Sequence, residues 1–223
     1  MTAVLPELVR AYVERNAPPV DAGRVRLTQV GEMELKPGRR IPFRANQEIA
    51  VEHVAFTWEA RFRLAPLVSL RVRDWCREGE GGLSARLFGL IRVVHGSGPE
   101  VARGEAMRYL AELPLAPQAM LRNPALIWRE LDDSRVEVST LVGASPVAVE
   151  LRFGAGGDIV EAYAADRPRG VGKDAVPTPW LGTFGDYGVL GGVRLPTTAA
   201  VAWLLPEGPQ TYFRGRITGL ELG

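Results

Sequence analysis

The chain is poor in cysteine and histidine. Of its 223 residues, Cys76 is the single cysteine, and His53 and His95 are the two histidines. One cysteine excludes a disulfide within the chain, and three such residues are too few for the usual zinc sites built from cysteine and histidine. We therefore expect no metal and no other cofactor.

The chain also lacks an excess of charge and a long hydrophobic run. Its 27 lysine and arginine residues nearly balance 26 acidic residues, so the formal net charge is +1. This balance gives no electrostatic argument for nucleic acid or an anionic membrane. The first residues carry charge by Glu7 and contain no uninterrupted apolar core, which argues against a secretory signal and a membrane span. We expect a cytoplasmic protein with no nucleic-acid partner and no integral membrane association.

Turn-forming residues are abundant instead. The 25 glycines and 17 prolines imply many turns, which fits short strands better than long helices. All-β sandwiches and barrels of this length are often one domain. We therefore predict a single domain over residues 1–223.

Two segments have the periodicity of amphipathic helices. In residues 99–113, apolar side chains recur at three- and four-residue spacing, and Pro99 suits a first helical turn. Residues 5–16 repeat this pattern. Gly104 lies inside the first of these segments, where it costs roughly 1 kcal/mol relative to alanine, so we expect a strand or a ligand to approach the backbone there.

Most of the remaining sequence has the chemistry of strands. From Phe56 to Arg63 apolar and polar residues alternate strictly, which predicts a half-buried antiparallel strand. Similar runs fill residues 25–94 and 126–222, where 83–94 is interpreted as one strand and 167–179 as the longest loop. About eleven strands, a helix at 5–16 and a helical insertion at 99–121 predict a mainly β (α+β) fold, with one large antiparallel sheet curled into a half-barrel or open barrel.

Several short motifs resemble catalytic or nucleotide-binding signatures, but each lacks residues that the signature requires. Residues 154–157 lack the last glycine of a dinucleotide fingerprint, and residues 170–173 lack both the first glycine and the hydroxyl residue of a phosphate loop. His95 stands where a nucleophile elbow around Ser97 requires glycine. The sequence therefore gives no catalytic residue.

Charged residues within apolar patterns are the more informative signal. Asp74 shares a strand face with valines and leucines, so in an interior it needs an arginine or a proton. We expect Asp74, Arg86, Glu105 and Arg108 to form a polar network where the central helix meets the sheet. Two alternatives remain: a β-bulge turns Asp74 to solvent, or Glu105 and Arg108 join Glu112 in a solvated row of ion pairs.

Aromatic residues from separate strands are the second signal. They could line a hydrophobic pocket in the hollow of a curled sheet or simply form core. Together with the charged residues they give the candidate ligand-binding set: Trp58, Arg86, Glu105, Arg108, Tyr109, Trp128, Trp180, Trp203 and Tyr212.

Two family resemblances add to these patterns. The segments ARGEAMRYLAEL (102–113), PWLGTFGDY (179–187) and VAWLLPEGPQTYFRGRI (201–217) resemble an uncharacterised bacterial domain family, which lends no activity. More distantly, the order of strands, helical insertion and strands, with the run at 147–167, resembles the lipoprotein-carrier (LolA/LolB-like) superfamily. That resemblance implies an open β-barrel, closed by helices, that holds acyl chains.

Three hypotheses about function follow. The first is a protein that binds a hydrophobic or lipid-like small molecule in the concave face of a half-barrel, unless the helices themselves fill that face. The second is an enzyme that uses the carboxylate and arginine group of Asp74, Glu105 and Arg108. The third is an interaction module or homodimer that covers apolar strand faces with another chain. A fold of this kind does not choose among them.

Overall fold

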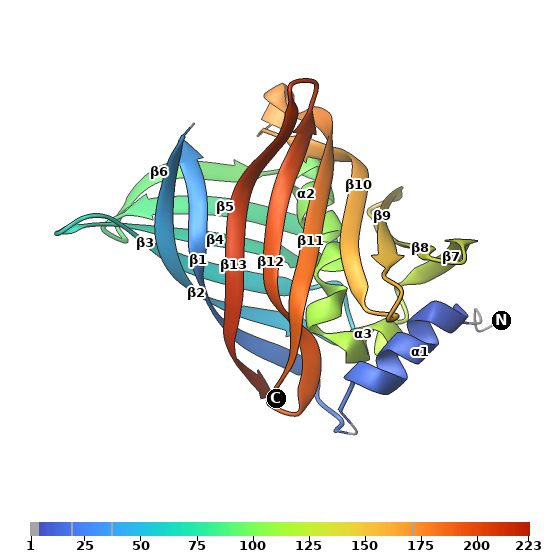
Figure 1. The fold of residues 1–223 in the computed structure, drawn as a ribbon. Coiled ribbons are helices and arrows are strands. Elements are labelled where there is room, and N and C mark those ends of the chain that lie inside the picture. Colours follow the sequence, from blue (N-terminus) through green and yellow to red (C-terminus); the bar gives the residue numbers. More distant parts are fainter. Residues whose placement is uncertain (1–4, 19, 37, 171) are drawn as a thin grey trace.

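The described residues of the chain fold into one antiparallel sheet of thirteen strands, with helices near its start and in its middle (Figure 1). The computed structural model describes residues 5–18, 20–36, 38–170 and 172–223. The spatial order of the strands is β6-β5-β4-β3-β2-β1-β13-β12-β11-β10-β9-β8-β7, so β6 and β7 are the two edges. The sheet is not closed, and the predicted open architecture is confirmed.

The strands and helices have the following bounds. The strands are β1 Arg24–Lys36, β2 Arg39–Ala50, β3 Phe56–Ala65, β4 Val68–Arg77, β5 Glu80–Leu87, β6 Ile91–Ser97, β7 Ile127–Asp132, β8 Arg135–Val142, β9 Ser145–Phe153, β10 Ile159–Arg169, β11 Val176–Leu190, β12 Val193–Leu205 and β13 Gly208–Leu222. The helices are α1 Glu7–Asn16, α2 Pro99–Ala111 and α3 Pro117–Arg122, with short 3-10 turns at Leu113–Leu115 and Gly172–Asp174.

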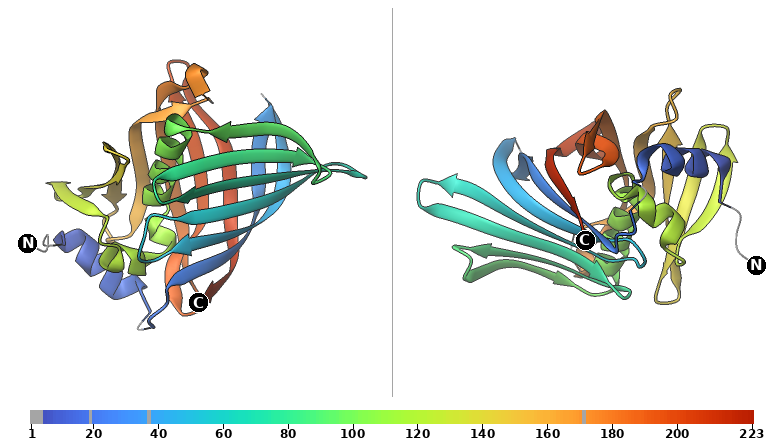
Figure 2. Two further views of the ribbon diagram at one scale, coloured as in Figure 1. Left: turned by 180° about the vertical axis from the view of Figure 1, so that it is seen from behind. Right: turned by 90° about the horizontal axis from the view of Figure 1, so that it is seen from below.

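Helix α2 lies between the two halves of the curled sheet. Strands β2–β5 run behind β11–β13 at a steep angle, and α2 closes the side where the halves separate (Figures 1 and 2). It packs against β4, β5 and β6 on one side and β8, β9 and β10 on the other. Because both sides are covered, most of α2 is buried, including Glu105. The alternative in which Glu105, Arg108 and Glu112 form a solvated row of ion pairs is therefore wrong.

Alternation along β3 agrees with the prediction. Phe56, Trp58, Ala60 and Phe62 are buried and face the interior, while Glu59, Arg61 and Arg63 are exposed. The interior between β2, β3 and β13 is aromatic: Phe43 contacts Trp58 edge-on at 5.6 Å between ring centroids and stacks on Phe213 at 5.4 Å. Such contacts hold the two halves of the sheet together.

Two sequence-based boundaries are wrong. Residues 83–94 form two strands, because the chain turns at Phe88 and Gly89, both at positive φ (54° and 74°). An apolar Phe-Gly pair lacks the usual Asn-Gly or Asp-Gly turn signal. Residues 167–179 are largely strand: β10 continues to Arg169 and pairs with β11, where Pro168 and Pro177 lie opposite each other.

Helix α2 approaches strand β5 closely, and the glycine that permits this contact lies in the strand and not in the helix. A Cβ atom on Gly81 of β5 would lie 2.7 Å from the Cα atom of Ala102. A Cβ atom on Gly104 would meet only Arg167 Nε, at an ordinary 3.9 Å. The close contact expected at Gly104 is therefore found at Gly81.

This contrast gives a matched pair of substitutions. Gly81→Ala is expected to destabilise the protein by about 1–3 kcal/mol, because the added methyl group forces β5 and α2 apart. Gly104→Ala is expected to stabilise it by about 0.5–1 kcal/mol, because alanine is the better helix former and the space is available. Chemical denaturation of both variants measures the difference, and equal effects of the same sign would contradict this packing.

Candidate functional site

A small cavity lies on the inner face of the sheet, between the C-terminal half of α2 and strands β11–β13. Its volume is about 130 Å³. Its wall is mainly apolar along β1 and β11–β13, where Gln29, Tyr212 and Arg216 are the polar or charged members, and it is charged where it meets α2, β4 and β10. We call it the inner cavity. Its lining residues are Gln29, Met33, Asp74, Arg108, Ala111, Glu112, Leu115, Arg167, Trp180, Gly182, Phe184, Pro196, Ala199, Ala200, Val201, Tyr212, Phe213, Gly215, Arg216 and Ile217.

Arg108 organises the charged part of the wall. It projects from α2 and donates hydrogen bonds to Asp74 Oδ2 at 2.7 Å and to Glu112 Oε1 at 2.9 Å. All three side chains are less than one-fifth exposed. Burial alone would lower the pKa of Arg108, but the two carboxylates raise it, so the guanidinium remains charged.

Neutral polar residues extend this network across the sheet. Trp58 Nε1 donates to Gln29 Oε1 at 3.0 Å, Gln29 donates to Gln47 at 2.6 Å, and Gln47 donates to Glu112. The Arg108 guanidinium lies 5.0 Å from the centroid of the Trp58 ring. The buried indole thus helps to position the arginine instead of lining the cavity.

Glu105 is the unusual member of the group. It is 8% exposed, and its Oε2 atom has no hydrogen-bond partner among the described residues. Burial, reinforced by the charge of Asp74, raises the pKa of Glu105 to about 8. Burial also raises the pKa of Asp74, although Arg108 opposes this shift.

The charges of this group balance only with a bound proton. We call Asp74, Glu105, Arg108, Glu112 and Arg167 the charged cluster: it has three carboxyl groups and two guanidinium groups. A buried excess charge is costly, so one carboxyl group takes a proton. The raised pKa of Glu105 identifies it as that group at neutral pH.

Arg167 differs from Arg108 in its bonding. It is 8% exposed and stacks on Trp180, with its guanidinium carbon 4.6 Å from the ring centroid. Among the described residues its Nη1 atom has no hydrogen-bond partner. Trp180 in turn donates to the Tyr212 hydroxyl at 3.0 Å, which places an aromatic wall beside the guanidinium.

The structure brings together part of the predicted set. Arg108, Trp180 and Tyr212 line the inner cavity, Glu105 lies behind its charged wall, and Trp203 stacks on Tyr212 at 5.9 Å.

Three predicted residues lie elsewhere. Arg86 is exposed on the outer face, because alternation in β5 turns its neighbour Ala85 inward. Trp128 lies on edge strand β7 beside the start of α1. Tyr109 joins α2 to its surroundings by donating to Ala50 O at 3.0 Å and accepting from Asn123 at 2.9 Å.

The sequence patterns do not identify Arg167, Gln29 or Gln47 as site residues, and they place Glu112 only in the alternative row of solvated ion pairs. Arg167 fell in a segment interpreted as a loop, so its side chain had no predicted face. Gln29 and Gln47 do occupy the inward positions of their strands, with neighbours Leu27 and Ile49 that are buried. A polar residue at such a position is the signal that could have identified them.

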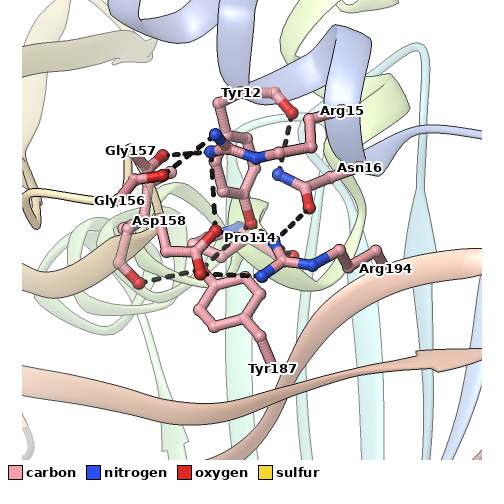
Figure 3. Close-up of polar contacts among 10 residues, drawn as sticks. Tyr12, Arg15, Asn16, Pro114, Gly156, Gly157, Asp158, Tyr187 and Arg194 are labelled. Carbon is pink, nitrogen blue, oxygen red and sulfur yellow. Dashed lines mark hydrogen bonds and ion pairs between the residues drawn. The ribbon is translucent and has the colours of Figure 1, made fainter.

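A second polar cluster holds α1 against the sheet (Figure 3). Arg194 of β12 binds Asp158 with two hydrogen bonds, at 2.6 and 2.8 Å, and also donates to Asn16 Oδ1 at 2.8 Å. The hydroxyl groups of Tyr12 and Tyr187 are 3.2 Å apart, and Tyr187 donates to Ile159 O at 2.8 Å. These contacts tie α1 to β12 and to the hairpin before β10, so we interpret the cluster as structural.

The described residues include no group of three histidine, cysteine or acidic side chains placed to hold a metal ion. None of the helices in the described part of the chain is long and apolar enough to cross a membrane.

Comparison with known proteins places the chain in a family without assigning an activity. A comparison with proteins of curated function finds no significant match. The crystal structure of a LolA superfamily protein from Nitrosomonas europaea is similar, with 11% sequence identity, a TM-score of 0.47, and coverage of 99% of this chain and 94% of that one. A family model described as a family of unknown function, DUF6544, matches residues 1–215. The chain therefore belongs to the DUF6544 family.

Proposed function

We propose that the inner cavity binds a small amphipathic molecule with an acidic head. The apolar body would contact Phe184, Val201 and Phe213, and the head would accept hydrogen bonds from Arg167. This proposal keeps the hydrophobic ligand expected from the sequence and adds a requirement for an anionic group.

The observation that supports it most is the guanidinium group of Arg167, which lines the inner cavity and makes no side-chain hydrogen bond or ion pair among the described residues. A buried guanidinium that lacks a hydrogen bond carries a free-energy penalty, which a bound carboxylate would remove. The carboxyl groups of Asp74 and Glu105 are near enough to affect the local charge, yet neither lies within 4.0 Å of Arg167 as an ion pair among the described residues. A ligand carboxylate could occupy that unfilled position, and a proton taken up by Asp74, whose pKa is raised by burial, would keep the charged cluster and its ligand neutral.

The volume limits the size of the ligand. About 130 Å³ is close to the roughly 150 Å³ of an engineered protein cavity that holds benzene. Pockets for drug-sized molecules are larger, about 300–1,000 Å³. The helices and aromatic side chains therefore fill most of the hollow, and we narrow the lipid-like ligand to a single-ring or short-chain acid.

Binding of matched acids and alcohols tests this proposal. Benzoate and hexanoate are expected to bind more tightly than benzyl alcohol and hexanol when measured by calorimetry or tryptophan fluorescence. Arg167→Gln is expected to weaken binding of the acids by about tenfold to a hundredfold and to leave the alcohols nearly unchanged, because a charge-assisted hydrogen bond contributes about 1.5–3 kcal/mol.

Two glycine substitutions provide the steric control. A side chain at Gly182, whose Cβ would meet no atom closer than 3.8 Å, projects into the cavity, so Gly182→Leu is expected to abolish binding of acids and alcohols alike. Gly156→Leu adds the same bulk in an exposed turn with open space and should bind like the wild type. Wild-type protein that binds none of the four probes, or a Gly182→Leu variant that binds them all, would refute the proposal.

One observation favours the enzyme hypothesis, namely the raised pKa of Glu105, since general acids and bases need such a shift. Glu105 is not among the residues that line the inner cavity. A ligand there would therefore meet Arg108 and Arg167 first, and we assign Glu105 an electrostatic role in the charged cluster.

A further inference from the structure

Five arginines lie in one row on the outer face of the sheet, opposite to the inner cavity. Pairing in register places Arg44 of β2 beside Arg61 of β3, Arg61 beside Arg71 of β4, Arg71 beside Arg86 of β5, and Arg86 beside Arg92 of edge strand β6. All five are exposed. With strands about 4.8 Å apart, this arginine row spans about 19 Å.

The arginine row is unusual because it is unpaired. Among the described residues, none of its five members makes an ion pair or a side-chain hydrogen bond. Three exposed arginines of the other half of the sheet are paired instead: Arg129 with Glu137, Arg135 with Asp132, and Arg152 with Glu161. Like charges directly opposite each other on neighbouring strands are destabilising. An anion that bridges the guanidinium groups would offset this cost.

The outer face is hollowed where the row lies. A groove of about 690 Å³ is lined by Arg44, Arg61, Arg71 and Arg86, together with polar side chains of neighbouring strands. Its one carboxylate, Glu59, is 3.4 Å from Arg73, which also lines the groove. The groove thus combines a strong positive charge with open access.

Apolar side chains gather at the end of the same strands. Leu67, in the turn between β3 and β4, is 90% exposed, and Leu90, in the turn between β5 and β6, is 83% exposed. A hydrogen bond of 2.8 Å from Phe88 N to Ser69 O joins these turns, and Phe88 itself is half exposed. They form the end of the sheet that projects away from α2 in Figures 1 and 2, which we call the apolar tip.

We propose that the arginine row and the apolar tip together bind the surface of a bilayer that contains anionic phospholipids. Arg61, Arg71 and Arg86 lie four to six residues from Leu67 or Leu90, or about 13–20 Å along extended strands. A tip buried about 5–10 Å in the headgroup region would bring the guanidinium groups close to the phosphate level. The apolar tip favours a membrane over a nucleic acid, because insertion buries leucine and phenylalanine whereas a phosphate backbone contacts only charge.

Vesicle flotation tests this surface. The intact protein is expected to bind vesicles of phosphatidylcholine and phosphatidylglycerol in equal parts, to bind pure phosphatidylcholine weakly, and to dissociate at high salt. Replacing Arg61, Arg71 and Arg86 by glutamine is expected to weaken binding about a hundredfold, since each basic residue near such a surface contributes about 1 kcal/mol. Leu67→Ser with Leu90→Ser is expected to weaken it about tenfold or more.

A second triple variant controls for net charge. Replacing Arg129, Arg135 and Arg152 by glutamine removes the same charge from the other half of the sheet and should leave binding nearly unchanged. The row variant should also melt no lower than the wild type, because it loses repulsion between neighbouring arginines. The proposal would be overturned by any of three results. These are equal losses of vesicle binding in the two triple variants, no binding of the wild type to anionic vesicles, and binding to a DNA oligonucleotide, but not to vesicles, that depends on the arginine row.

Discussion

Replacing Arg108 by methionine is expected to lower the free energy of unfolding by about 3–5 kcal/mol. The substitution leaves Asp74 and Glu112 buried without their shared partner, and breaking one side of a buried ion pair has a cost of this size. It also removes the guanidinium from the ring of Trp58. Urea denaturation monitored by tryptophan fluorescence measures the loss.

Two comparisons isolate the cause. Arg103→Met removes a more exposed pair with Asp166 from the same helix and should cost no more than about 1 kcal/mol. Adding Asp74→Asn and Glu112→Gln to Arg108→Met should recover much of the loss, because the two carboxylates that lost Arg108 are then neutral. If Arg108→Met were no more damaging than Arg103→Met, the charged cluster would not stabilise the fold as described.

Glu105 is expected to make stability depend on pH in a direction opposite to most carboxylates. Its pKa is about 8 in the folded state, against roughly 4.3 in an unfolded chain. Between these two pKa values the folded protein holds a proton that the unfolded chain releases. The contribution of Glu105 to the free energy of unfolding is therefore greatest below the unfolded pKa and is lost as the pH rises toward 8. The slope approaches about 1.4 kcal/mol per pH unit and levels off above pH 8.

Glu105→Gln should remove this dependence. Glutamine resembles the protonated side chain, so the variant should match the wild type near pH 4 and exceed it by a few kcal/mol at pH 9. Asp74, whose pKa is also raised, gives a residual slope of the same sign, and Cys76 stays protonated because burial raises its pKa to about 12.

Glu100→Gln, exposed on the same helix, is the control. If the free energies of unfolding of the wild type and of Glu105→Gln changed in parallel with pH, Glu105 would not be the group that holds the proton.

The architecture could be predicted because it depends on local patterns. Strict alternation in residues 56–63 determines which face of β3 is buried, and Pro99 begins α2 where the sequence indicates. The turn at Phe88 was missed because its positive φ comes from tertiary context and not from a turn-forming residue. Pairing of β10 with β11 similarly holds Arg167 in a strand despite two nearby prolines.

The charged cluster and the arginine row were harder to predict, because both depend on which elements become neighbours in the fold. Asp74 and Arg108 are distant in sequence and meet only because α2 packs against β4. A net charge of +1 conceals the arginine row, since the neutralising carboxylates lie on other parts of the molecule. Register between strands, which aligns Arg61, Arg71 and Arg86, is not visible in composition.

A crystal structure of the protein grown with saturating benzoate tests the central claim most directly. We expect electron density for a planar ring in the inner cavity, between Phe184 and Phe213, with a carboxylate oxygen within hydrogen-bond distance of the Arg167 guanidinium group. A cavity without such density, or benzoate bound only elsewhere on the molecule, would contradict the claim that this hollow is a binding site.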